Sequence, residues 1–194
     1  MFYCCNALDS ISSIHLLASI MAEGCYQSMF EMFYGGSALT SIPQNFLPAT
    51  TLAKACCEGM FNRCSALTSV PQNLLPATTL APICYDGMFR SSGITQAPIL
   101  PAPELVKNCY AQMFTGCKKL NSVTCLATSG IHTETEGNHS TYLWLQDAGT
   151  QASGVKLFYK ASSVPVGSGT SGQYWPTDYS GIPSGWTVRD YTTP

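Results

Sequence analysis

The chain has 194 residues, enough for one ordinary domain or for a repeat array that ends in a cap. Charged residues make up only 10% and the formal net charge is −2, so we expect no basic surface for nucleic acid or for an anionic membrane. The ten cysteines form no C-x-x-C pair and stand at no metal-ligand spacing from a histidine. We therefore expect neither a bound metal nor a cofactor.

Residues 11–22 are apolar enough to be compared with the core of a signal peptide. No Lys or Arg precedes them, and Asp9 lies where a signal peptide carries positive charge. The segment also aligns with later copies of a repeat, so we interpret it as repeat sequence. We expect any export signal to lie outside this chain or to be absent, and we expect no transmembrane span.

The phrase Cys-Tyr-x-x-Met-Phe returns along the chain. Its Met-Phe pairs start at residues 1, 29, 60, 88 and 113, so consecutive starts are 28, 31, 28 and 25 residues apart. Self-similarity at this period is typical of solenoid proteins. The sequence therefore predicts a stack of repeats over residues 1–127.

Each repeat has two halves of different periodicity. The first half is short and β-branched, and it predicts strands at residues 8–11, 39–42, 67–71, 94–97 and 120–123. In the second half Leu80, Cys84 and Met88 fall at i, i+4 and i+8, with a second apolar residue after each. This spacing predicts a helix of about three turns per repeat. The predicted fold is an α/β solenoid of one short strand and one short helix per repeat.

Helices need about 8–10 Å between axes, whereas strands stack at about 4.8 Å. We therefore expect a curved array with its sheet on the concave side. The cysteines of the repeats occupy fixed columns, one of which contains Cys25, Cys56, Cys84 and Cys109. On helices at that spacing they would be too far apart for disulfides, so we expect reduced core thiols.

The repeat pattern MFxxCxxLTSxPxxLLPATTLAxxCYxxMF resembles the BspA-like class of bacterial leucine-rich repeats. The resemblance covers residues 1–127, and residues 128–194 resemble the segment that follows such repeats. It implies a secreted or cell-surface bacterial protein that works in adhesion through contact with a host or bacterial surface protein or a glycan. No catalytic motif accompanies the resemblance, so we expect a protein that is not an enzyme.

Residues 128–194 contain all three tryptophans and no further copy of the phrase. We expect a small α+β cap with a helix over residues 138–148, strands at 155–159 and 186–191, and a loop at 167–172. A cap is expected because a solenoid must cover its last repeat.

Two surfaces are candidate binding sites. The first is a polar column on the predicted strands, expected to face out on the concave sheet: Asp9, Thr40, Thr68, Thr95 and Asn121. An ordinary solvated ladder is the favoured explanation of this column, and a specific site is the alternative. The second is the pair Tyr174 and Trp175, which could stack against a sugar or could belong to the core of the cap. The Met and Phe columns are interpreted as a buried ladder rather than a groove.

The leading hypothesis is a non-enzymatic binding or adhesion module. The alternative is a structural spacer or self-assembly module without a specific ligand. The strand at residues 8–11 would have no upstream neighbour in this chain, so we expect either that further repeats precede it in the natural protein or that this N-terminal edge pairs with another molecule, as in self-association.

Overall fold

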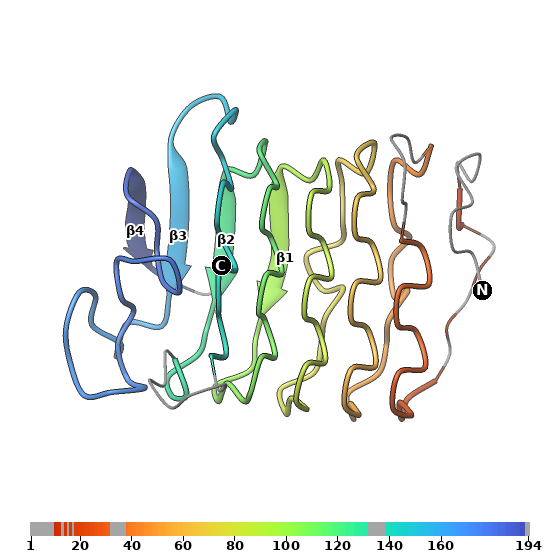
Figure 1. Cartoon of the computed structure of the whole chain (residues 1–194), viewed down its shortest axis with the longest axis horizontal. Helices are drawn as coiled ribbons and strands as arrows, with labels where there is room; N and C mark the ends of the chain where they lie inside the picture. The colour runs from red at the N-terminus through yellow and green to blue at the C-terminus, as the bar shows by residue number, and fades with distance from the viewer. Residues whose placement is uncertain are drawn as a thin grey trace.

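The computed structural model describes residues 10–12, 14, 16, 18–31, 38–131 and 139–192. Over these residues it contains four strands and no helix. The chain forms a stack of rungs side by side along the long axis of the molecule (Figure 1). Each rung has a sheet wall, built from the predicted strand half of a repeat, and a coil wall, built from the predicted helical half.

The sheet wall contains β1 (Gln96–Leu100), β2 (Ser122–Cys125), β3 (Lys156–Lys160) and β4 (Trp186–Asp190). All neighbours are parallel and lie in the order β1-β2-β3-β4 (Figure 1). The register aligns Gln96, Ser122, Leu157 and Thr187 in one row across the sheet. A second row contains Ile99, Thr124, Tyr159 and Arg189.

Earlier rungs continue this wall with single parallel bridges instead of full strands. Ser41 bridges Ser69 in line with Gln96 of β1. A separate column of bridges, Ile20 to Thr51, Thr51 to Thr79 and Glu104 to Ser129, lies ahead of the coil wall in each of these rungs. Pro43 and Pro71 follow Ser41 and Ser69, and the equivalent Pro98 lies inside β1, where the register shifts between Gln96 and Ile99. Among the described residues, full strands form only toward the C-terminal end of the stack.

The coil wall consists of residues 23–30, 54–63, 82–91, 107–116 and 140–151. Its backbone N–H groups alternate between two kinds of partner. Met88 N–H donates to Tyr85 O three residues back, whereas the next one, Phe89 N–H, donates to Met113 O of the following rung at 3.0 Å. The same alternation occurs in the other rungs, with Phe30 donating to Met60 O and Phe114 to Trp144 O. The wall is therefore a run of overlapping tight turns bonded to its neighbours.

Every fourth residue of the coil wall has a left-handed backbone. In one rung these residues are Ile83 (φ 63°), Gly87 (φ 58°) and Ser91 (φ 56°). A helix cannot contain such residues, because right-handed turns require negative φ throughout. The four-residue period also explains the sequence pattern, since buried residues then recur at i, i+4 and i+8 without any helix.

The prediction of one helix per repeat is therefore wrong, and so is the α/β solenoid class. The reason lies in the spacing of the rungs. Phe30, Phe61, Phe89 and Phe114 stack on the coil side with ring centroids 5.3, 5.7 and 5.9 Å apart. Helices would need about 8–10 Å. Curvature was expected because helices would be spaced more widely than strands. Here backbone hydrogen bonds link neighbouring rungs on both walls, so the two walls have no such difference in spacing.

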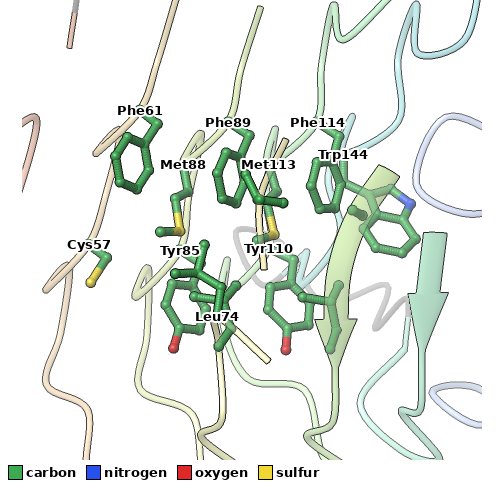
Figure 2. Packing of buried hydrophobic residues seen from close by; sticks show 14 of the residues in the cluster. Cys57, Phe61, Leu74, Tyr85, Met88, Phe89, Tyr110, Met113, Phe114 and Trp144 are labelled. Atoms are coloured by element: carbon green, nitrogen blue, oxygen red, sulfur yellow. The ribbon is translucent and has the colours of Figure 1, made fainter. Parts of the chain in front are cut away.

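The space between the walls is filled by columns of identical residues, as Figure 2 shows for the Phe and Met columns. Phe30, Phe61, Phe89 and Phe114 are all 0% exposed, and the rings of Tyr85 and Tyr110 stack at 6.1 Å. The interpretation of the Met and Phe columns as a buried ladder is confirmed. The eight described cysteines are free thiols, and all except Cys25 are buried.

The tail continues the stack. Residues 140–151 add a divergent rung to the coil wall, in which Ser140 O accepts from Tyr110 N–H and Tyr142 O from Gln112 N–H. The helix expected at residues 138–148 is therefore wrong over the described residues 139–148. The two predicted tail strands are confirmed as β3 and β4, but they extend the repeat sheet instead of forming a separate one.

Residues 161–185 cover the end of the core. Trp175 stacks on Trp144 at 5.3 Å and meets Phe158 edge-on at 5.0 Å. The Trp144 indole N–H donates to Gly181 O at 2.8 Å, and the Thr141 hydroxyl donates to Ser180 O at 2.7 Å. The loop therefore closes the last rung with aromatic packing and with hydrogen bonds to buried polar groups.

Candidate functional site

The sheet wall has one face toward the core and one toward solvent. On β2 the side chains of Val123 and Cys125 are 0% exposed, so the intervening Thr124 points to the opposite face. On β3 Phe158 is buried while Tyr159 is half-buried on that same opposite face. This outer face of the sheet carries polar and aromatic side chains and is the candidate functional site.

The predicted Thr column lies along this face at the start of each rung. Thr68 N–H donates to Thr40 O at 3.1 Å, Thr95 N–H to Thr68 O at 3.4 Å, and Asn121 N–H to Thr95 O at 2.8 Å. The three threonines are exposed and Asn121 is half-buried. The structure thus aligns these four residues as one column, whereas Asp9 lies outside the described residues.

A polar hollow of about 250 Å³ opens beside this column on the outer face. It lies over the row of Ile99, Thr124 and Tyr159 and is bordered by the chain that follows β4. Its lining consists of Gln72, Gln96, Ile99, Ser122, Thr124, Tyr159, Tyr191 and Thr192. No lining side chain carries a charge.

The polar groups of this hollow are largely unused by the protein. Thr124 is 8% exposed, yet its hydroxyl has no hydrogen-bond partner among the described residues. The same holds, within the described part of the chain, for the hydroxyls of Ser122, Tyr159 and Tyr191. Gln72 donates through its side-chain amide to Ala97 O at 3.2 Å. Thr124 Oγ1 is not one of the fully buried polar atoms that lack a partner, so it reaches solvent and is open to an external partner.

An apolar hollow of about 280 Å³ adjoins the polar one and shares Gln72 and Ile99 with it. Leu75, Pro76 and Pro101 provide its apolar surface. The two hollows together form a groove that runs across neighbouring rungs. We call it the sheet groove.

A different hollow, of about 250 Å³, lies on the coil wall and is acidic. Burial raises the pKa of Asp86 to about 7, with a further contribution from the Glu58 carboxylate and an opposing one from Arg90. Burial also raises the pKa of Glu58. The cluster is satisfied internally in part, since Gln27 donates to Glu58 and Asn62 donates to Glu31. No group of three metal-ligating side chains able to hold an ion is found in the described residues.

The second predicted site is not assembled as a surface. Trp175 is 0% exposed and packed between Trp144 and Phe158, and only Tyr174 is partly accessible. A sugar would find no free Trp175 ring to stack on. Within the described residues there is also no helix long and apolar enough to cross a membrane.

Sequence reasoning missed the residues of the sheet groove, including Thr124, Tyr159 and Tyr191. One available signal was the repeated Pro-Gln-Asn at residues 43–45 and 71–73, which places a polar side chain after each strand stop. The other was the alternation of Lys156–Lys160, in which Tyr159 takes the face opposite to Phe158. Neither signal indicates that the C-terminal segment returns to border the hollow.

The chain was compared with protein-family models, with curated proteins and with solved structures, and none of the three comparisons gives a match.

Proposed function

We propose that this chain is a non-enzymatic binding module that captures its ligand on the outer face of the sheet. The observation that carries the proposal is the sheet groove, which is lined by uncharged side chains and in which the hydroxyls of Ser122, Thr124, Tyr159 and Tyr191 have no partner among the described residues. Hollows with a few convergent polar groups on a preformed scaffold are the usual form of ligand sites. The polar columns beside the groove extend the surface over several rungs, as in other solenoids that bind extended ligands.

The resemblance of the repeats to BspA-like leucine-rich repeats supports a role in adhesion, in a secreted or cell-surface bacterial protein. Under this proposal the ligand is a host or bacterial surface protein or a glycan. Chemistry on the ligand is not part of the proposal, because neither hollow of the groove is lined by an acid, a base or a cysteine.

The test is a binding screen of the purified chain against arrays of glycans and matrix proteins. We expect capture on at least one array. We expect the triple variant Thr40→Lys, Thr68→Lys, Thr95→Lys to lose that capture, because three long charged side chains would crowd the approach to the groove. The urea unfolding midpoint should stay near that of the wild type, since all three threonines are exposed. A folded wild-type chain that binds nothing on either array would refute the proposal.

The alternative, a self-assembly module, draws on one observation. β4 pairs only with β3, and no strand or bridge on its other side is found in the described residues. Open strand edges can pair with a second chain. The N-terminal edge that the sequence suggested for such pairing lies mostly outside the described residues. Light scattering over a range of concentrations distinguishes the two candidates, because only assembly predicts a mass that grows with concentration.

A further inference from the structure

The polar hollow of the sheet groove presents hydroxyl and amide groups. The hydroxyl of Thr124 has no hydrogen-bond partner among the described residues and is not one of the fully buried polar atoms that lack a partner, so it reaches solvent in the hollow. A ligand hydroxyl can take the place of water at this group. Ser122 on the same strand, and Gln96 beside it in the register, add further donors and acceptors.

Charge is absent from both hollows. Neither is lined by a Lys, Arg, Asp or Glu. A phosphate, sulfate, carboxylate or ammonium group placed here would lose its hydration without a charged side chain in the lining to compensate, although Arg189 lies opposite Tyr159 on the next strand. The site therefore favours an uncharged polar ligand.

Two aromatic rings border the polar hollow. Tyr159 and Tyr191 are half-buried, and neither hydroxyl has a hydrogen-bond partner in the described part of the chain. A tyrosine offers both a flat apolar ring and a polar tip. A sugar ring matches this arrangement, because its C–H face packs on an aromatic ring while its hydroxyls point to the edges.

The dimensions fit more than one sugar unit. The polar hollow holds about 250 Å³, equal to about eight water molecules at roughly 30 Å³ each, which is enough for one ring. The adjoining apolar hollow of about 280 Å³, with Leu75 and Pro101, can take the apolar face or an acetyl methyl of a second ring.

We infer that the sheet groove binds a neutral oligosaccharide, with one ring in the polar hollow hydrogen-bonded to Thr124 and packed on Tyr159. This inference rests on the proposed function of the sheet face and assigns the class of its ligand. A peptide fits less well, because peptides that extend a sheet pair with the backbone of an edge strand, and the groove lies over the face of β1 to β3.

The experiment uses the whole chain and a panel of neutral oligosaccharides built from glucose, galactose, mannose or N-acetylglucosamine, with sialylated and sulfated oligosaccharides alongside. Affinities are measured by isothermal titration calorimetry. We expect binding within the neutral set. Thr124→Val, which keeps the shape of the side chain and removes its hydroxyl, should weaken binding by about tenfold. Tyr159→Ala should weaken it by about tenfold or more, and Tyr159→Phe by less.

The matched control is Thr187→Val, the same substitution at an exposed position of β4 that lines neither hollow, and it should leave the affinity unchanged. Neutral-sugar binding that survives both Thr124→Val and Tyr159→Ala would overturn the inference. Binding only to matrix proteins, lost in the triple threonine variant, would overturn it while leaving the proposed function intact. No binding of any kind would overturn both.

Discussion

Trp175 stacks on Trp144 with ring centroids 5.3 Å apart and an angle of 11° between the rings. Both side chains are 0% exposed, so the most conspicuous aromatics of the tail serve packing instead of recognition. The pair joins the divergent last rung of the coil wall to the covering loop. The Trp175 ring is therefore closed to a ligand, whereas Tyr159 and Tyr191 of the same tail line the hollow on the sheet face.

Replacement of Gly87 by alanine tests the coil wall directly. Gly87 has φ 58°, and a Cβ built there meets no atom within 4 Å, so only the backbone conformation is perturbed. In this left-handed conformation alanine should destabilise the protein by about 1–2 kcal/mol. In a helix the same change would stabilise it by about 0.5–1 kcal/mol. The sign of the change in urea unfolding free energy therefore distinguishes the two folds.

Ser91→Gly is the reciprocal control, since Ser91 is exposed and has φ 56°. Glycine there relieves strain in the coil, so stability should not fall. A loss of about 0.5 kcal/mol or more, together with a gain for Gly87→Ala, would contradict the coil wall.

Loss of one ring from the Phe column should be costly. Phe89 stacks between Phe61 at 5.7 Å and Phe114 at 5.9 Å, and all three side chains are fully buried. Phe89→Ala should lower the free energy of unfolding by about 3–5 kcal/mol. Ile20→Ala, at a position 71% exposed, should change it by only about 0.5 kcal/mol. Equal effects of the two variants in urea denaturation would argue against a stacked column.

The acidic hollow predicts a pH dependence of stability. The pKa of Asp86 is raised to about 7 from its ordinary value of 3.8, mainly by burial, so the folded chain holds this proton more tightly than the unfolded chain. Its contribution to stability is complete below about pH 4 and is lost as the pH rises through about 7. Asp86→Asn should therefore reduce the difference between urea midpoints at pH 5 and pH 8.

Asp147→Asn, an exposed position outside the acidic hollow, is the control and should keep the wild-type difference. Other acidic groups contribute in both proteins, and burial also raises the pKa of Glu58. The comparison therefore concerns how much each substitution changes the difference between the urea midpoints at pH 5 and pH 8. If the Asp86→Asn protein kept the full wild-type difference between its urea midpoints at pH 5 and pH 8, Asp86 would be excluded as the source of that pH dependence.

Access should decide which cysteine of the stack reacts first. Cys25 is exposed, whereas Cys56, Cys84 and Cys109 are buried. The neighbouring Cys57 thiol lowers the pKa of Cys56, yet Cys56 is 0% exposed. Burial raises the pKa of Cys109 to about 12. Peptide mapping after brief alkylation of the native chain should show label at Cys25 and little at the other three; rapid labelling of Cys84 would contradict the buried column.

The sequence predicted the repeat, the strands of the C-terminal rungs and the buried columns because each depends on local chemistry repeated in register. It did not predict the coil wall, because over three turns a period of four residues cannot be separated from the helical 3.6. Leu80, Cys84 and Met88 satisfy both. The decisive difference is the positive φ at Ile83, a β-branched residue that rarely adopts it. Only the bonding between rungs imposes that conformation.

The candidate site was predicted in part. Side chains at equivalent positions of successive repeats point to the same face of the sheet wall. The expected column therefore forms, with Thr40, Thr68, Thr95 and Asn121. The sheet groove depends on features with no local signature. The Thr124 row meets residues 191 and 192 only after the chain has passed through β4 and turned back over the face.

The alternating bonds of the coil wall have a consequence for how such a chain can vary in length. Each interior rung of the described coil wall is bonded to the rung before it and the rung after it through backbone groups that successive rungs present in the same way. A whole rung could therefore be gained or lost by duplication or deletion, and the new neighbours would join through an identical set of bonds. Changes upstream of residue 60 would leave the groove-forming rungs intact. The molecule could thus evolve a longer or shorter reach while keeping the same binding end.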